Sequence, residues 1–174
     1  MRPPCPVRLI ASLLAALAVP AAAQTPGGWT SYVTPSGATR VDFPERLFSR
    51  KAGPAQEGSG ETFRTSDGRA ELIVYELDNA DRDTPASYLR KHLIFASTTL
   101  HYRRVSDRFF AISGKRDSLT FYSRCNFSGG RGLMHCLYVA YPQQETRAWD
   151  ATVTRLSHSL RASGAPEARR RRSD

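Results

Sequence analysis

The fold is decided by two strand-forming stretches, LTFYSRCN at 119–126 and LMHCLYVAY at 133–141. Both are rich in the aromatic and aliphatic residues that favour strands, and FSGGRG at 127–132 joins them. The glycines of the joining stretch supply the positive φ angles that a tight turn needs. Together the three stretches predict a β-hairpin whose turn centres on Gly130 and Arg131.

This register brings two cysteines together. With the turn at that position, Cys125 lies directly opposite Cys136, and Cα atoms of opposed residues are roughly 4.5–5.5 Å apart, within the range of a disulfide. A reactive thiol activated by His135 is the alternative, but adjacent residues of a strand point to opposite faces. We therefore expect a Cys125–Cys136 disulfide, which would stabilise the fold by ~3 kcal/mol.

Residues 1–23 are typical of a secretory signal peptide. A short basic start precedes the apolar run LIASLLAALAV at 9–19, and small alanines follow a proline. We expect cleavage near Ala23-Gln24 and a mature protein that is periplasmic or secreted, with Cys5 removed. The apolar run is shorter than the ~20 residues of a transmembrane helix, so no transmembrane segment is expected after cleavage.

The composition indicates one domain with a substantial apolar core. The chain has 174 residues, of which 40% are hydrophobic, and its formal net charge is +9. A run of arginines at 169–172 supplies part of that charge. We expect residues 163–174 to be a disordered Arg-rich tail. The alternative is a tail that binds an anionic polymer or membrane surface, although no specific nucleic-acid partner is expected.

Hydrophobic periodicity predicts further hairpins and two helices. One helix begins at Thr84-Pro85 and runs to about Thr99, and the other covers about Glu145–Ala162. The resulting order, ββ-ββ-α-ββ-ββ-α, predicts an α+β domain at 24–162 with a mostly antiparallel sheet and helices packed on both faces. The other expected strands lie at 29–33, 39–43, 61–66, 70–77, 102–105 and 109–113, with a mobile loop at 51–60 and a turn at 114–117.

A set of dispersed aromatic and turn residues runs through 28–162: Trp29, Tyr32, VDFP at 41–44, Phe63 with Asp67-Gly68 and Tyr75, FFAISG at 109–114, Tyr122 and Tyr141-Pro142. With the closing amphipathic helix, this set resembles the PsbP-like superfamily. The resemblance implies an α/β/α sandwich and a non-enzymatic role in binding partners. No catalytic or ligand-binding residue of that family has a matching position in this sequence, so none is carried over.

The pattern contains no catalytic or metal-binding motif. The four histidines lack the spacing of metal ligands, and no nucleophile elbow or phosphate-binding loop occurs. Tyr122, Asn126 and His135 could form a polar site, because the hairpin register places Asn126 opposite His135. A small hydrolase-type enzyme of unrecognised class is therefore the alternative function.

Two charged segments complete the candidate sites. Arg103, Arg104 and Arg108 could form a basic patch for an acidic partner, but strand alternation would send the first two to opposite faces. The acidic loop 78–83 could hold calcium, but it lacks the interior glycine and closing glutamate of an EF-hand loop. We expect no metal and no cofactor.

The sequence therefore predicts an exported, non-catalytic binding or accessory protein. Its partner is expected to be an unidentified protein or component of the cell envelope, and the chain itself is expected to be a monomer.

Overall fold

The computed structural model describes residues 28–92, 98–128 and 132–164. The predicted signal peptide and residues 165–174 of the predicted tail lie outside this part of the chain. Within it, no helix is both long and apolar enough to cross a membrane.

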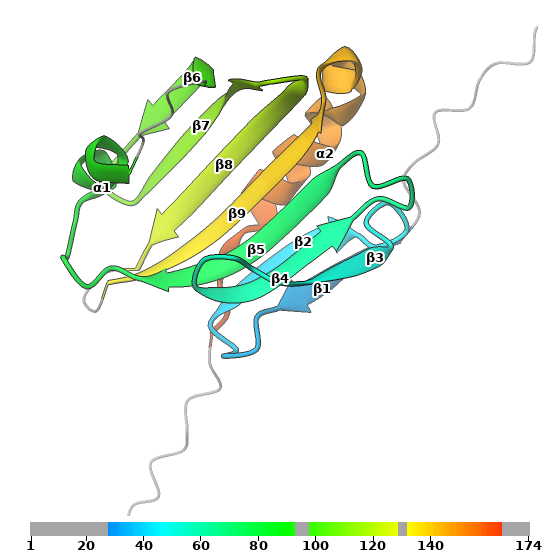
Figure 1. The fold of residues 1–174 in the computed structure, drawn as a ribbon. Helices are drawn as coiled ribbons and strands as arrows, with labels where there is room; N and C mark the ends of the chain where they lie inside the picture. The colour runs from blue at the N-terminus through cyan, green and yellow to red at the C-terminus, as the bar shows by residue number, and fades with distance from the viewer. Residues whose placement is uncertain (1–27, 93–97, 129–131, 165–174) are drawn as a thin grey trace, which may run out of the picture.

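The described chain forms a large and a small antiparallel sheet with two α-helices (Figure 1). The helices are α1 (Pro85–His92) and α2 (Thr146–Ser159), the second preceded by a 3₁₀ turn at Gln143–Glu145. The strands are β1 (Trp29–Val33), β2 (Thr39–Pro44), β3 (Arg50–Pro54), β4 (Ser59–Arg64), β5 (Glu71–Asp78), β6 (Thr98–Val105), β7 (Phe109–Arg116), β8 (Leu119–Phe127), β9 (Leu133–Pro142) and β10 (Arg161–Ala162).

The large sheet has seven strands in the order β3-β4-β5-β9-β8-β7-β6. Its β8–β9 hairpin has the predicted register, with Cys125 opposite Cys136 and Asn126 opposite His135. The Sγ atoms of the two cysteines are 2.01 Å apart and their Cα atoms 4.1 Å apart, so the structure joins them as a disulfide. The single α+β domain with mostly antiparallel pairing is confirmed.

One face of the large sheet is covered by α2 and by the small sheet β1-β2-β10. The buried stripe predicted on α2 is confirmed, since Trp149, Val153, Leu156 and the following Leu160 are all buried. These side chains share one apolar core with residues of β2, β4, β5 and β9. The covering layer thus includes a second sheet, which the expected sandwich of helices did not contain.

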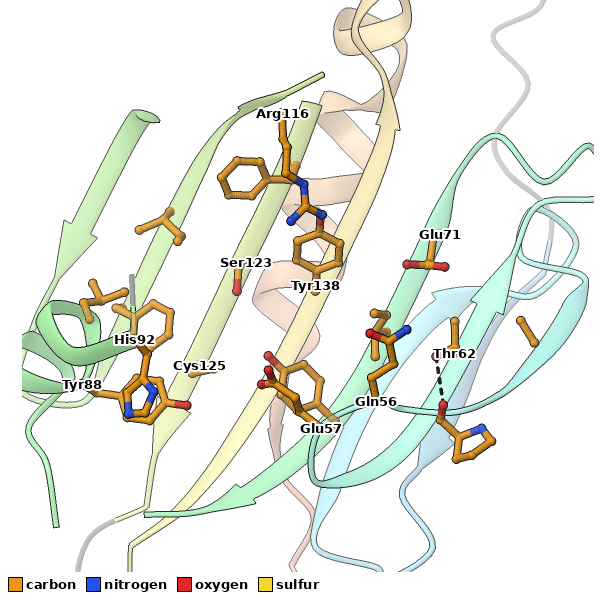
Figure 2. A pocket seen from close by; sticks show the side chains of 18 of the residues that line it. Gln56, Glu57, Thr62, Glu71, Tyr88, His92, Arg116, Ser123, Cys125 and Tyr138 are labelled. Atoms are coloured by element: carbon orange, nitrogen blue, oxygen red, sulfur yellow. Dashed lines mark hydrogen bonds between the residues drawn. The ribbon is translucent and has the colours of Figure 1, made fainter. Parts of the chain in front are cut away.

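The other face carries only α1 among the described residues. Leu89 of this helix packs in a second apolar cluster with Phe110, Cys125 and Cys136. α1 is short and lies over one end of the sheet (Figure 1). A hollow lies beside it on the same face (Figure 2).

Several predicted boundaries were wrong. The loop expected at 51–60 contains β3 and the start of β4; β3 is an exposed edge strand whose pairing with β4 is irregular, so it shows no clear periodicity. Thr99, expected in the first helix, lies in β6, and residues 93–97 are outside the described part. The turn expected at 114–117 is mostly strand, because β7 continues to Arg116 before Asp117 adopts a positive φ of 54°. The second helix ends at Ser159, and Arg161–Ala162 pairs with β2 instead.

Candidate ligand-binding site

A cavity of about 450 Å³ lies on the open face of the large sheet, between α1 and the β3–β4 connection (Figure 2). Strand pairing explains its floor: Tyr138 of β9 lies between Ile73 of β5 and Ser123 of β8. Cross-strand neighbours point to the same face, so these side chains all project into the hollow. The cavity is also lined by Phe110, Ile112, Phe121, Tyr75 and Cys125.

The floor is aromatic, and tyrosine hydroxyls give it a partly polar character. The rings of Phe121 and Tyr138 stack with their centroids 6.1 Å apart. Burial raises the pKa of Tyr75 and of Tyr138 above the ordinary tyrosine value. Both hydroxyls therefore remain protonated at neutral pH and can donate hydrogen bonds to a ligand.

The wall formed by α1 is also aromatic. Tyr88 stacks on His92 at a centroid distance of 4.2 Å and on Phe110 at 6.0 Å. The spacing of Tyr88 and His92 is one helical turn, which places both rings on the same side of the helix. The predicted helix therefore contributes the side wall of the site through its aromatic residues.

Charged groups surround the hollow. Figure 2 shows Arg116 at one end and Glu57 at the other, with Tyr138 between them. The Nη2 of Arg116 donates a hydrogen bond to the hydroxyl of Tyr138 at 3.0 Å. At the side, Arg64 and Glu71 form an ion pair with an N–O distance of 2.8 Å.

Glu57 is an exposed carboxylate without an ion pair or hydrogen bond to any residue that the structure describes. Its negative charge adds to burial in raising the pKa of Tyr75 and of Tyr88. The carboxylate of Glu57 thus raises the pKa of these two cavity tyrosines, and its own oxygens are available to a ligand.

The polar site expected from Tyr122, Asn126 and His135 is not formed. These side chains lie on the covered face, where Ser157 and Arg124 connect Tyr122 with Asn126 while His135 is bound to other groups. The Tyr122 hydroxyl is 2.7 Å from Oγ of Ser157, and Nδ2 of Asn126 donates to the carbonyl of Leu160 at 2.9 Å. His135 is 3% exposed, so the three residues offer no shared open pocket.

His135 belongs instead to a buried polar chain that ends at Glu76. Oε2 of Glu76 accepts the hydroxyls of Thr34 at 2.8 Å and Thr39 at 2.9 Å. Oγ1 of Thr39 lies 2.7 Å from Nδ1 of His135, and Oγ of Ser128 lies 2.6 Å from its Nε2. Because the Thr39 hydroxyl already donates to the carboxylate, its oxygen must accept a hydrogen bond from Nδ1–H.

Burial lowers the pKa of His135, and the charge of Glu76 opposes that effect. The ring is therefore neutral at pH 7, with its proton on Nδ1 and its Nε2 accepting from Ser128. Glu76 was not among the site residues predicted from the sequence. The available signal was its position in β5, two residues after Val74 on the inward-facing side.

The three arginines of the predicted basic patch are not assembled into one surface. Arg103 lies opposite Ile112 and Arg104 opposite Ala111, so the two point to opposite sides of the sheet. The guanidinium of Arg104 lies 5.5 Å from the centre of the Phe109 ring. Arg108 lines a separate hollow beside α1.

No group of three metal-binding side chains occurs in the described residues. In the acidic loop, Nζ of Lys91 lies 3.2 Å from Asp81 and 2.9 Å from Asp83. The side chain of Asn79 bonds the backbone of Asp83. The side-chain oxygens of Asn79, Asp81 and Asp83 are thus engaged in stabilising the loop and α1.

Comparisons with known proteins identify relatives in fold. The chain is similar to the solution structure of cyanobacterial PsbP from Synechocystis, with a TM-score of 0.54, 9% identity and coverage of 77% of this chain and 92% of that one. It is also similar to the Ran-binding protein Mog1p of Saccharomyces cerevisiae, with a TM-score of 0.56, 8% identity and coverage of 78% and 96%.

A scan against protein-family models finds no match, and neither does a search of curated proteins. The similarity to PsbP and Mog1p therefore concerns the fold. The PsbP-like resemblance read from the sequence is confirmed at that level.

Proposed function

We propose, with the fold shared by PsbP and Mog1p as the premise, that this chain is a non-catalytic binding protein. Its binding site is the hollow on the open face of the large sheet. The observation that carries the proposal is the cavity of about 450 Å³ with an aromatic floor. Ligand sites of this kind have volumes of roughly 300–1,000 Å³, apolar linings and a few convergent polar groups.

The likeness to Mog1p supports a binding role, since that protein is described as Ran-binding. The polar groups around the hollow also suit recognition. Tyrosine hydroxyls, the free carboxylate of Glu57 and the guanidinium of Arg116, which forms no ion pair among the described residues, surround apolar rings, an arrangement that orients a bound molecule.

We further propose that the protein acts in the periplasm or outside the cell. The predicted signal peptide at 1–23 and the disulfide between Cys125 and Cys136 support this location, because disulfides persist in oxidising compartments. Mass spectrometry of the protein recovered from its native host should find a mature N-terminus near Gln24. An intact Met1 with free thiols would contradict the location.

Binding can be tested by filling the cavity. Ser123 lines the floor and is only partly exposed, so Ser123→Phe should occupy the hollow without removing an apolar core contact. The control is Ala151→Phe, which adds the same ring at an exposed position of α2 on the covered face. We expect the apolar dye anilinonaphthalene sulfonate to bind the parent protein and the control, and to lose most of its fluorescence with Ser123→Phe.

Equal dye binding by all three proteins would contradict the proposed site. Circular dichroism and the melting temperature establish that each variant is folded before the fluorescence is compared.

A further inference from the structure

The two ends of the cavity carry opposite charges. Arg116 marks one end and Glu57 the other (Figure 2). Among the described residues, neither side chain forms an ion pair, whereas the neighbouring Arg64 and Glu71 neutralise each other. A hollow with an apolar floor and free opposite charges at its ends is complementary to a ligand with an apolar body and two charged ends.

We infer, on the basis of the binding function proposed above, that the ligand is a short peptide with free amino and carboxyl ends and a bulky apolar side chain. Its carboxylate binds Arg116, its ammonium group binds Glu57, and its apolar side chain packs on the aromatic floor.

The Arg116 end is suited to a carboxylate. A guanidinium has five N–H donors in a planar fork, and its hydrogen bond to Tyr138 uses Nη2. The Tyr138 oxygen accepts that bond, so its own O–H remains available as a second donor toward the same carboxylate.

The Glu57 end is suited to an ammonium group. A carboxylate only accepts hydrogen bonds, and an ammonium group only donates them. Tyr75 and Tyr88 line the same cavity as Glu57, and the charge of Glu57 adds to burial in raising the pKa of both tyrosines. Aromatic faces attract cations, so the rings would reinforce the carboxylate in holding the amino end.

The strand geometry sets the length of the peptide. Tyr75 pairs with Cys136, two residues along β9 from Tyr138. At about 3.4 Å per residue, these two levels of the sheet are ~7 Å apart. The Tyr138 side chain leans beyond its own level, because its ring stacks on Phe121, which pairs with Ala140. An extended peptide covers at most ~3.6 Å per residue, so two or three residues span these levels of the sheet.

The test uses the tripeptide alanyl-phenylalanyl-alanine in four forms: free, N-acetylated, C-amidated and blocked at both ends. Binding of each form to the full mature protein is measured by isothermal calorimetry. We expect each block to weaken binding about tenfold, since one lost charge-assisted contact costs on the order of 1.4 kcal/mol.

Two variants assign the charged ends. Glu57→Gln should weaken the free peptide but leave the N-acetylated form unchanged, because that form no longer has an ammonium group. Arg116→Gln should weaken the free peptide but leave the C-amidated form unchanged. Both residues are exposed, so the folded state should be retained, and the blocked peptides test the same contacts without any substitution.

The outcomes separate this inference from the proposed site. If blocking either end has no effect, or the free tripeptide does not bind at millimolar concentration, the ligand class is wrong. If that happens while Ser123→Phe still abolishes dye binding, the cavity remains the proposed binding site. If Ser123→Phe binds the free tripeptide as the parent does, the peptide does not occupy this cavity and the inference is overturned.

Discussion

Removing the Thr39 hydroxyl by Thr39→Val should destabilise the protein more than the same substitution at Thr62, another buried strand threonine. Thr39 is fully buried and connects Glu76 with His135 through contacts of 2.9 and 2.7 Å. Thr39→Val retains the β-branched shape and the strand preference of the residue. The substitution therefore isolates the polar contacts from the packing of β2 against the large sheet.

The magnitude follows from the groups left without partners. The carboxylate of Glu76 loses one of its two threonine donors, which costs roughly 1.5–3 kcal/mol for a bond to a charged group. Nδ1–H of His135 becomes an unsatisfied buried donor, which costs roughly 1–3 kcal/mol. Because the two losses share one hydroxyl, we expect a combined loss of about 3 kcal/mol.

The assay is urea unfolding of the disulfide-bonded protein at neutral pH. With an m value of about 2 kcal/mol/M, a loss of about 3 kcal/mol lowers the midpoint by ~1.5 M. The matched control is Thr62→Val, because Thr62 is also buried in a strand, and its hydroxyl has one long contact of 3.5 Å. If Thr39→Val costs no more than the control, the buried chain does not contribute to stability as argued.

Three further predictions concern the same fold. Burial lowers the pKa of His135 below the ordinary 6.5, so below pH about 6.5 the unfolded chain binds a proton that the folded chain does not, and the free energy of unfolding should decrease as the pH is lowered. In His135→Gln, the urea midpoint should therefore change less between pH 7.5 and 5 than in the parent protein. An equal change in both proteins would assign the pH dependence to other groups. Replacing both Cys125 and Cys136 by alanine should cost about 3 kcal/mol in urea unfolding, and a loss below ~1 kcal/mol would indicate a hairpin that persists in the unfolded chain. Gly114→Ala would place a Cβ 2.2 Å from the carbonyl oxygen of Thr99, so hydrogen exchange should show loss of protection in β6 and β7; full protection at both strands would show that they adjust to the methyl group.

The central hairpin could be predicted because its determinants are local. The turn glycines, the strand-forming residues and the spacing of Cys125 and Cys136 all lie within one short segment of sequence. The buried stripe of α2 was predictable for the same reason, since a helix shows its apolar face by periodicity alone. The sequence therefore identified these two elements correctly.

Other elements depend on residues far apart in the sequence. β3 is exposed along most of its length and is a strand because β4 pairs with it, so its own residues show no alternation. β10 consists of two residues that pair with β2. In both cases the partner strand determines the structure, and the segment itself resembles a loop.

The candidate site was not predictable for a related reason. Glu57, Arg116 and Tyr138 come from three separated parts of the chain and meet only when the sheet has formed. The predicted pairing of Asn126 with His135 used a local register and was correct. The pair lies on the covered face of the sheet, where His135 is buried, so it does not form an open site.

The pairing of β10 with β2 has a consequence for attachment. The described chain enters the domain at β1 and leaves it at β10, and both strands belong to the small sheet that covers the face away from the hollow. An affinity handle, a reporter protein or a surface linker fused after Ala162 would therefore point away from the cavity mouth. The protein can accordingly be immobilised on a sensor surface by its carboxyl end, while the cavity on the open face of the large sheet remains accessible to ligands in solution.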